Sequence, residues 1–247
     1  MRDSVEDMKP RRVTEEFDRA ALSYDRLVGA NPGYHAHLRA SVRRLHLPGK
    51  GAGLRVLDLG CGTGASTAAL LAVLPLAEIV AVDASEGMLS VARAKRWPDN
   101  VRFVRARAED LRAADLGGPF DAALAAYLVR NCPDPDGVLA TVAGLLRPGG
   151  RLAVHEYSVA DSAAARAVWT LVCWSVIIPA GRALTGRADL YRYLWRSVLD
   201  FDGAARLRGR LARCGYRDVR TVALPGWQRG IVHTFLGRRP TRAEEAA

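Results

Sequence analysis

The chain has 247 residues, of which 36 are basic and 26 acidic, so its formal net charge is +10. Hydrophobic residues make up 49% and charged residues 25%, the proportions of a soluble globular protein, which excludes disordered and fibrous classes. The basic residues are scattered rather than grouped. This pattern favours a solvated positive surface over a nucleic-acid site.

Cysteine spacing and apolar runs bear on where the protein works. The 4 cysteines form no CxxC pair, so no metal is predicted and a reduced, cytoplasmic protein is expected. The first residues are charged and contain no apolar core, which argues against a secretion signal. The longest uncharged apolar run, 167–181, has 15 residues. A bilayer span needs about 20, so this run is expected to form an apolar lid or to touch a membrane surface.

The first 50 residues predict a cap of two helices. Helical periodicity extends over 14–27 and again over 34–45, and a turn at 29–33 separates the two. After a glycine-rich connector, the pattern changes to short apolar strands that alternate with helices. Such alternation predicts a parallel sheet covered on both faces. The strands are expected at 55–59, 78–82, 101–104, 121–126 and 151–155, and the helices at 67–74, 85–96 and 135–146.

The last third of the chain has a different pattern. Helical stretches at 163–184 and 189–199 predict a helical insert after the fifth strand. An amphipathic helix over 204–214 precedes two apolar strands, 217–223 and 230–236, which are expected to form an antiparallel edge. The simplest organisation is one domain over 1–247: a helical cap (1–50), a cofactor-binding core (51–158), the insert (159–200) and a final helix with a strand pair (201–247).

A glycine-rich turn follows the first strand. The strand leads into Gly60, Gly62 and Gly64 and then directly into a helix. Glycine lets a backbone bend sharply and approach a ligand closely, and the helix start offers unpaired N–H groups. Because ligands of open α/β sheets bind at the carboxyl ends of the strands, this loop, with Cys61 and Thr63, is predicted to hold a nucleotide-like cofactor.

Two acidic residues bear on the identity of that cofactor. Asp83 ends the second strand, where a carboxylate accepts the ribose hydroxyls of a dinucleotide or of S-adenosylmethionine. The loop also fits the pattern G-x-G-x-x-A, so its spacing leaves NAD open. Asp58 favours S-adenosylmethionine, because its charge would repel a pyrophosphate but suits a sulfonium and an amino group. A buried carboxylate without a ligand is the structural alternative for Asp58.

The sequence resembles the class I S-adenosylmethionine-dependent methyltransferases. The resemblance rests on VLDLGCGTG, VDASEGML, FVRARAEDL, PFDAAL and LLRPGGRLAVHEYS, which follow one another within residues 50–158. It implies an α/β fold with a doubly wound, mostly parallel, seven-stranded sheet of the Rossmann-like methyltransferase type. It also implies S-adenosyl-L-homocysteine as product and a ribose held by Asp83. The remaining cofactor contacts would come from Ala84, Met88, Arg107, Ala108 and Glu109.

A narrower resemblance, to the ubiquinone/menaquinone biosynthesis C-methyltransferase family, reaches nearly the whole chain. It rests on Tyr24-Asp25, on Arg130-Asn131 followed by Asp134, and on the segments RPGGRL, EYS, ADLYRYL and GIV. The chain departs from that family after Tyr24-Asp25, where the Met-Asn pair and a Trp are missing. His155 also stands where the family has an aliphatic residue.

Methyl transfer from a sulfonium is an in-line displacement, and a ring carbon becomes a strong nucleophile when an adjacent phenol ionises. The resemblance implies that Arg130 and Asn131 organise the phenol and a water. Because the pKa of an arginine exceeds about 12, Arg130 suits a phenolate-stabilising role. Water or Glu156 would then accept the proton. Tyr191, from the insert, is predicted to be a further catalytic residue.

These residues also have structural alternatives. Arg130 could pair with Asp134 on the surface, and Asn131 could cap a helix. Glu156 could form a structural pair. One of Tyr191 and Tyr193 is expected to pack in the core, and His155, inside a strand, is expected to be a core histidine with its hydrogen bonds satisfied.

The function predicted from the sequence is C-methylation of a hydrophobic aromatic compound, such as a prenylated hydroquinone. One alternative is an O- or N-methyltransferase of a specialised metabolite. A second is a non-catalytic, cofactor-binding partner subunit. No nucleic-acid partner is expected. Peripheral contact with the inner face of a membrane and self-association into a homodimer stay open.

Overall fold

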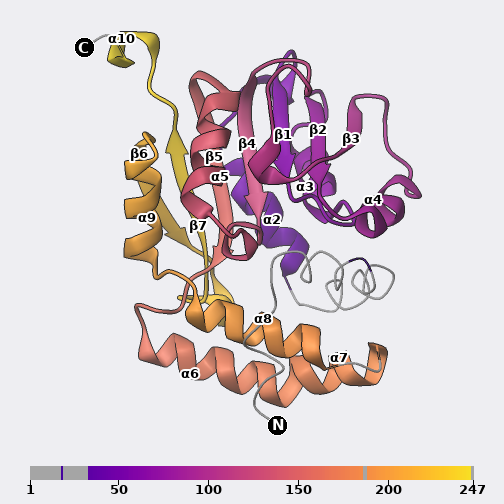
Figure 1. Cartoon of the computed structure of the whole chain (residues 1–247), viewed down its shortest axis with the longest axis vertical. Helices are drawn as coiled ribbons and strands as arrows, with labels where there is room; N and C mark the ends of the chain where they lie inside the picture. Colours follow the sequence, from indigo (N-terminus) through magenta and orange to yellow (C-terminus); the bar gives the residue numbers. More distant parts are fainter. Residues whose placement is uncertain (1–17, 19–32, 186–187, 246–247) are drawn as a thin grey trace.

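The computed structural model describes Asp18 and residues 33–185 and 188–245 of the chain. At its centre is a seven-stranded sheet with the strand order β3-β2-β1-β4-β5-β7-β6 (Figure 1). Every neighbouring pair from β3 to β5 is parallel, while β7 runs antiparallel to both β5 and β6. The predicted α/β fold with a mostly parallel, seven-stranded sheet is confirmed. The strands are β1 (Arg55–Leu59), β2 (Glu78–Asp83), β3 (Val101–Arg105), β4 (Phe120–Ala126), β5 (Leu146–Tyr157), β6 (Arg217–Ala223) and β7 (Val232–Arg238).

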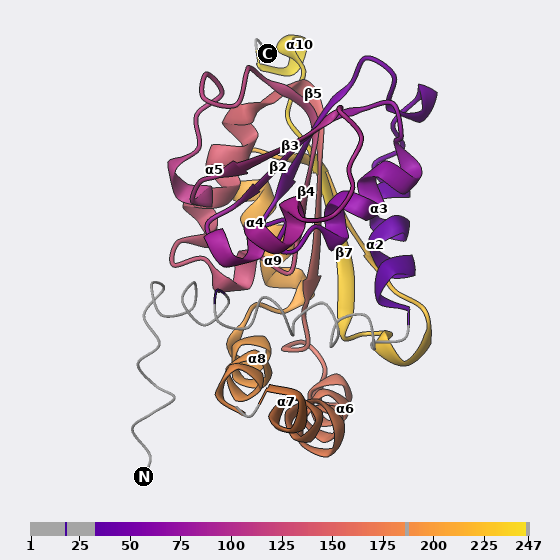
Figure 2. The same ribbon diagram turned by 90° about the vertical axis from the view of Figure 1, so that its right-hand side faces the viewer.

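Helices cover both faces of the sheet, as Figure 2 shows with the sheet edge-on. One face carries α2 (Tyr34–Arg43), α3 (Ala65–Val73) and α4 (Glu86–Arg93), and the other carries α5 (Pro135–Leu145) and α9 (Ala204–Arg213). The short α10 (Arg242–Glu245) follows β7. Because both faces are covered, most residues of β1 and β4 are buried, and all the buried ones except Asp58 are apolar, which is typical of central parallel strands.

The predicted boundaries differ from the structure mainly at the fifth strand. The sequence predicts a strand over 151–155 after a helix stop at 147–150. In the structure, the strand begins at Leu146, directly after α5, and continues to Tyr157. A register irregularity between Phe120 and Ala122 of β4 accommodates the extra residues. The helix predicted over 85–96 ends at Arg93, and Ser85 caps its start by accepting a hydrogen bond from the Met88 N–H.

The insert lies beyond the carboxyl ends of the parallel strands (Figure 2). It consists of α6 (Ala163–Val172), the π-helical turn η4 (Cys173–Ile177), α7 (Ile178–Thr185) and α8 (Asp189–Asp200). Pro179, which has no N–H to donate, is the second residue after the π-helical turn. Trp169, Cys173 and Tyr191 fill the space between these helices and Tyr157 of β5.

The expectation that the apolar run is too short to span a bilayer does not hold for the folded helix. Residues Ala163–Ala183 form 21 continuous helical residues, and an 18-residue stretch of them has a mean hydropathy of 1.5, which suffices for a span by length and composition alone. One face of this helix nevertheless packs onto α8 and the sheet end.

Part of the predicted helical cap lies outside the described residues. The helix expected over 14–27, apart from Asp18, and the Tyr24-Asp25 segment belong to this part. The second predicted helix of the cap, 34–45, is observed as α2 and packs beside α3.

Candidate functional site

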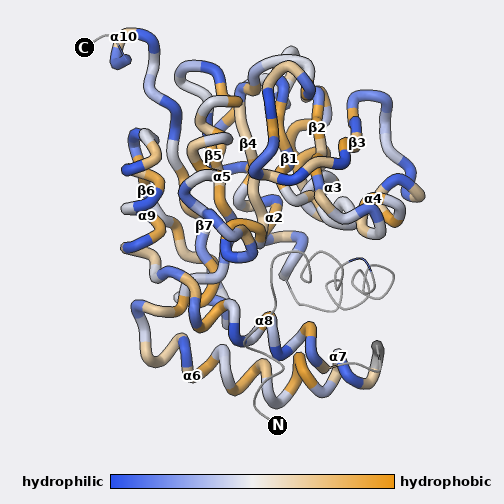
Figure 3. Tube along the Cα trace, in the orientation of Figure 1, coloured by the Kyte–Doolittle hydropathy of each residue, from blue (hydrophilic) through white to orange (hydrophobic). Residues whose placement is uncertain are grey.

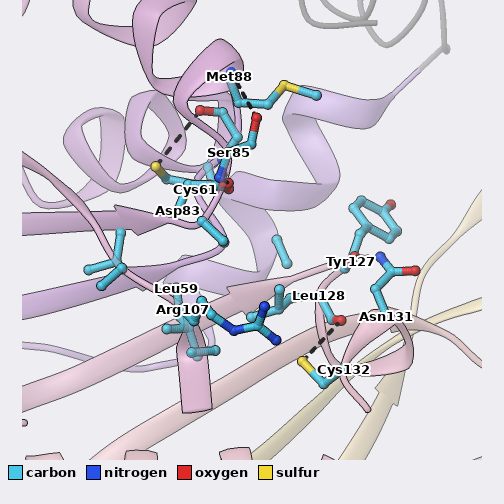
Figure 4. Close-up of a pocket in the computed structure, with 18 of the residues that line it drawn as sticks. Leu59, Cys61, Asp83, Ser85, Met88, Arg107, Tyr127, Leu128, Asn131 and Cys132 are labelled. Atoms are coloured by element: carbon cyan, nitrogen blue, oxygen red, sulfur yellow. Dashed lines mark hydrogen bonds between the residues drawn. The ribbon is translucent and has the colours of Figure 1, made fainter. Parts of the chain in front are cut away.

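A pocket opens at the carboxyl ends of β1, β2 and β4, the edge where the sequence predicts a cofactor. Figure 4 shows Asp83, Ser85 and Met88 on one side of it and Tyr127 and Asn131 on the other. Among the predicted cofactor residues, Asp58 and Gly64 do not line this pocket. The predicted residues that do line it are Gly60, Cys61, Gly62, Thr63, Asp83, Ala84, Met88, Arg107, Ala108 and Glu109.

The glycine loop is held by its own backbone. The N–H groups of Gly60 and Cys61 both donate to the carbonyl of Val82, at 2.8 and 3.0 Å, which fixes the loop against β2. Gly60 has a φ of 72°, and a Cβ placed on it would lie 2.9 Å from Leu128 Cδ1. A side chain at this position would therefore meet both backbone strain and a steric clash.

Gly64 has a structural role. It is the N-cap of α3 with a φ of 92°, and a Cβ on it would lie 2.7 Å from the Trp97 ring. The Trp97 indole N–H donates to the carbonyl of Ala92, and Lys95 donates to the carbonyl of Thr63 at 2.7 Å. The segment after α4 therefore supports the loop from outside the pocket.

Asp83 ties the loop to the second strand. Its Oδ2 accepts a hydrogen bond from the Gly62 N–H and its Oδ1 accepts one from the Ser85 N–H, both at 2.8 Å. Burial raises the pKa of Asp83, while the N–H groups of Ser85, Gly62 and Ala84 act in the opposite direction. A carboxylate has about four acceptor sites, so two backbone donors leave capacity for the hydroxyls of a ribose.

Asp58 lies beneath the pocket and is fully buried. Its Oδ2 accepts hydrogen bonds from Ser66 Oγ (2.9 Å) and Thr67 Oγ1 (2.6 Å), which join β1 to the start of α3. Its Oδ1 is buried and has no hydrogen-bond partner within the described part of the chain. Burial raises the pKa of Asp58 to about 7, although Thr67 and Ser66 oppose the shift. Direct contact of Asp58 with a cofactor stays a prediction.

The far wall of the pocket comes from the short turn η2 (Ala108–Asp110) and the residue before it. Arg107 is exposed and lies 3.6 Å from Glu109. On the opposite wall, Met88 is buried at the first turn of α4. An apolar side chain, a charged pair and a backbone turn around one opening fit the face and the polar edge of a purine ring.

Tyr127 is a site residue that the sequence reasoning missed. It follows the last residue of β4, lines the pocket and has a φ of 55°, which is unusual for a residue other than glycine. Its N–H donates to the His155 carbonyl at 2.7 Å. Its own carbonyl accepts from Arg130 Nη1 (3.2 Å) and Asn131 Nδ2 (3.1 Å). One residue therefore organises two of the residues predicted to be catalytic, Arg130 and Asn131.

Arg130 and Glu156 form a buried ion pair at the sheet edge. Arg130 Nη1 lies 2.5 Å from Glu156 Oε1, and both side chains are almost inaccessible to solvent. The Tyr157 N–H also donates to this carboxylate, at 3.0 Å. Burial raises the pKa of Glu156, and the Arg130 charge opposes the shift. The alternative of a surface pair between Arg130 and Asp134 is wrong, because Asp134 caps α5 instead.

Asn131 lines the pocket and connects it to the insert. Its Oδ1 accepts a hydrogen bond from the hydroxyl of Tyr193 at 3.2 Å. Arg130 Nε lies 3.4 Å from Ser197 Oγ, which comes from the same helix, α8. Tyr191, predicted to be catalytic, is instead buried in the apolar core of the insert, against Gly181. Of the two tyrosines, Tyr193 is the one that reaches the site.

Neither Arg130 nor Glu156 lines the pocket itself. They lie directly behind Asn131 and Tyr127, with Arg130 over the ring of Tyr157 at 5.3 Å. The structure therefore brings Arg130, Asn131 and Glu156 together and sets Tyr191 apart from them. Within the described residues, no group of three or more histidine, cysteine or acidic side chains could hold a metal ion.

The pocket as a whole fits S-adenosylmethionine. The loop lets a ligand approach the backbone at Gly62, where a Cβ would meet nothing within 4 Å. Asp83 has acceptor capacity for a ribose, and Asp58 supplies a buried carboxylate with an unpartnered oxygen below the cationic end of such a ligand. The charged residues that line the pocket are two carboxylates, Asp83 and Glu109, and one arginine, Arg107, which is a less favourable balance for a pyrophosphate than for a cationic ligand.

Comparison with known proteins supports this assignment. The sequence profile of the ubiE/COQ5 methyltransferase family matches residues 5–238. A ubiquinone/menaquinone biosynthesis C-methyltransferase UbiE from Ectopseudomonas mendocina is 31% identical over 96% of this chain and 93% of its own. A demethylmenaquinone methyltransferase from Mycolicibacterium paratuberculosis is 34% identical over 96% of this chain and 97% of its own.

Solved structures share the fold at lower identity. A possible histamine N-methyltransferase from Thermotoga maritima superposes with a TM-score of 0.65 at 19% identity, covering 92% of this chain and 99% of its own. Magnesium protoporphyrin IX methyltransferase from Synechocystis, solved with bound S-adenosylhomocysteine, gives a TM-score of 0.64 at 18% identity, covering 93% and 99%. From this extent of matched sequence, the chain is an S-adenosylmethionine-dependent methyltransferase that belongs to the ubiE/COQ5 methyltransferase family.

Proposed function

We propose that this enzyme methylates a ring carbon of a prenylated hydroquinone, in the biosynthesis of a respiratory quinone. One observation carries the proposal. The cofactor end of the pocket leads, through Tyr127 and Asn131, to a buried Arg130–Glu156 pair beneath an insert filled with aromatic and aliphatic side chains. The relatives named as UbiE and as demethylmenaquinone methyltransferase support the same substrate class.

When bound, S-adenosylmethionine supplies an electrophilic methyl group. This chain must hold the ring carbon in line with that methyl group and increase the electron density of the ring. Arg130 lies directly behind the pocket wall, where its positive charge can stabilise negative charge that develops on a phenol oxygen, because its own proton is not lost at physiological pH. Asn131, fixed by Tyr127 and Tyr193, can orient the phenol or a water beside it.

The ring proton must leave after the new carbon–carbon bond has formed. Glu156 is fully buried and accepts hydrogen bonds from Arg130 and Tyr157, so its role is to fix Arg130. Water bound at Asn131 is therefore the proton acceptor in this proposal. The apolar insert limits the number of such waters and leaves room for a prenyl chain.

The test supplies methyl-labelled S-adenosylmethionine and a chemically reduced, prenylated naphthohydroquinone that lacks the ring methyl group. We expect label in the organic phase on that compound, and about 100-fold less in Arg130→Met, which loses the positive charge behind the pocket wall. If lipid extracts become labelled on another molecule, the methyltransferase chemistry stands and the quinone substrate is wrong. If only polar metabolites become labelled, the O- or N-methyltransferase alternative is favoured.

We also propose that the enzyme works in the cytoplasm, at the inner face of the membrane, and docks there through the outer face of α6–η4. Leu171 is 67% exposed, Val176 58% and Trp174 49%. Figure 3 shows hydrophobic colour along the middle of α6–α7, beyond the end of the sheet. The chain carries a net charge of +10, which suits anionic headgroups. An apolar face on a basic protein is typical of an interfacial helix.

Sedimentation with vesicles tests the docking proposal. We expect binding to anionic phosphatidylglycerol vesicles, weaker binding to neutral phosphatidylcholine vesicles, and loss of binding in Leu171→Ser/Trp174→Ser. Leu76→Ser is the matched control, because Leu76 is 59% exposed outside the insert. Equal binding of both variants would contradict the proposal. A dimer that buries α6–η4, seen in solution by scattering, would also contradict it.

A further inference from the structure

We propose that a second site, apart from the cofactor pocket, binds a soluble small molecule that carries two or more phosphate groups. The site is a groove of about 440 Å³ between the end of α2 and strands β5, β6 and β7. This volume lies within the range of small-molecule pockets, about 300–1,000 Å³. The charged and imidazole side chains that line the groove are Arg44, His46, Arg151, Asp218, Arg220 and Arg238.

The groove exists because the helices cover β6 unevenly. On one face of β6, Val219 packs against the core that contains Leu207 and Leu211 of α9. Arg220, the next residue, lines the groove on the opposite face, because successive side chains of a strand alternate between faces. On that face α2 packs against α3 and β5, and the groove opens beside the end of α2. The edge of the sheet therefore keeps an open, basic surface.

Arg44 brings the first positive charge into the groove. Its Nη1 donates to Thr234 Oγ1 at 2.5 Å, and its Nη2 donates to the Ala223 carbonyl at 3.3 Å. Both acceptors are uncharged, so they fix the guanidinium without neutralising it. The side chain is half-buried, and this burial lowers the pKa of Arg44. An anion in the groove would compensate the cost of burying this charge.

Arg151, at the amino end of β5, is held in a similar way. Its Nη1 donates to the carbonyls of Leu45 (2.5 Å) and His46 (2.8 Å), which follow α2. An arginine has five N–H donors, so Nε and Nη2 remain for a ligand. The guanidinium is thus fixed in position by neutral backbone groups, and its charge stays uncompensated.

The carboxylate that lines the groove does not cancel these charges. Asp218 pairs with Arg238 Nε, and both terminal nitrogens of Arg238 bond Glu244 at 2.6 Å. Arg220 is exposed and has no hydrogen bond or ion pair with any residue that the structure describes. Among the described residues, Arg44 and Arg151 likewise form no ion pair. Three positive charges therefore face one groove without carboxylate partners of their own.

Phosphate groups match this arrangement. The planar fork of a guanidinium binds two phosphate oxygens at once, and a fork that is already fixed loses little freedom on binding. A diphosphate spreads its negative charge over two groups, which suits several guanidiniums better than a single phosphate does. Arg151 begins the part of β5 whose far end, Tyr157, contacts the insert. The groove therefore lies away from the apolar face of α6–η4 proposed to dock on a membrane (Figure 2), which favours a soluble ligand over a lipid headgroup.

The test is calorimetry with inorganic pyrophosphate on the full-length protein, saturated with S-adenosylhomocysteine to fill the cofactor pocket. We expect saturable binding with a Kd of about 1 mM or lower, about tenfold weaker binding of orthophosphate, and weakening of both by salt. Arg151→Met and Arg220→Met should each weaken pyrophosphate binding about tenfold, the effect of one charged hydrogen bond. Arg208→Met is the matched control, because Arg208 is exposed on α9, outside the groove.

Arg220→Met keeps the test valid if Arg151→Met fails to fold, because Arg220 makes no hydrogen bond that the fold needs. The proposal is overturned if pyrophosphate does not bind saturably, if it competes with S-adenosylhomocysteine, or if Arg208→Met weakens binding as much as Arg220→Met. It is also overturned if Arg220→Met loses binding to phosphatidylglycerol vesicles as fully as Leu171→Ser/Trp174→Ser, because headgroup phosphates would then occupy the groove. None of these results depends on which compound the enzyme methylates.

Discussion

The two ends of the pocket are held in place by different kinds of interaction. At the cofactor end, backbone groups dominate: the N–H groups of Gly62 and Ser85 bind Asp83, and those of Gly60 and Cys61 bind the Val82 carbonyl. At the substrate end, side chains hold one another. Here Arg130 pairs with Glu156, Asn131 bonds Tyr193 and Tyr127 bonds His155.

The difference has a consequence for how the two ends tolerate change. Backbone geometry at the cofactor end depends on glycine at a few positions and on the strand–loop–helix connection, so the fold itself fixes it. Side-chain pairs at the substrate end can be exchanged without altering the sheet. Substitutions should therefore abolish cofactor binding at one end and change substrate preference or stability at the other.

The largest expected effect comes from breaking the buried ion pair. Arg130→Met leaves the Glu156 carboxylate buried without its partner, which should lower the free energy of unfolding by about 3–5 kcal/mol. Urea denaturation measures this value. Arg147→Met, which breaks a more exposed pair with Asp121, should cost less than about 1 kcal/mol. Equal losses of unfolding free energy in the two variants would show that the buried Arg130–Glu156 pair stabilises the fold no more than an exposed ion pair does.

Asp58 should make the stability of the protein depend on pH. Its pKa is raised to about 7 in the folded state, against about 4 in the unfolded chain. The folded state therefore binds more protons between these values, and stability should fall as the pH rises through this window.

Relative to Asp58→Asn, the free energy of unfolding of the wild type should decrease by on the order of 3 kcal/mol from about pH 5 to about pH 8. Urea denaturation at a series of pH values, without cofactor, measures this difference. Parallel pH profiles for the two proteins would mean that Asp58 is ionised throughout.

Asp83 offers the sharpest test of the cofactor end. Asp83→Asn removes the charge that should bind the ribose hydroxyls, so affinity for S-adenosylhomocysteine should fall by about 30- to 100-fold in calorimetry. Asp121→Asn is the matched control, because Asp121 lies at the opposite edge of β4 and bonds the Arg55 N–H. An unchanged affinity in Asp83→Asn would remove this carboxylate from the cofactor site.

The smallest effect concerns the contact between the insert and the pocket. Tyr193→Phe deletes the hydrogen bond to Asn131, and kcat should fall by about three- to tenfold while the affinity for S-adenosylhomocysteine stays the same. Steady-state kinetics with the prenylated hydroquinone measures this change. A change in cofactor affinity of similar size would mean that Tyr193 acts on the other end of the pocket.

The contrast between a cofactor end held by backbone groups and a substrate end held by side chains also explains what the sequence could predict. The glycine loop and Asp83 lie at strand ends, and the alternation of strands and helices determines where these ends meet. The structural alternative for Arg130 was a surface pair with Asp134, its neighbour in sequence. Its partner is Glu156, which the parallel pairing of β4 with β5 brings beside it.

Side-chain choices within the insert were harder to predict. Tyr191 and Tyr193 are two residues apart and point to different sides of α8, and only the packing of that helix decides which one faces Asn131. In the sequence, Tyr127 continues the apolar pattern of the strand before it, so the pattern alone does not mark it as a site residue. Its place at the carboxyl end of β4, directly before the Arg130-Asn131 pair, is the signal that could have identified it.

The central claim is that this enzyme forms a carbon–carbon bond on a hydroquinone ring. The most direct measurement is the position of a ¹³C-labelled methyl group in the product formed from S-adenosylmethionine and the prenylated naphthohydroquinone, by NMR spectroscopy. We predict a single methyl group attached to a ring carbon. A methyl group on oxygen, or cofactor binding without product from this substrate, would contradict the claim.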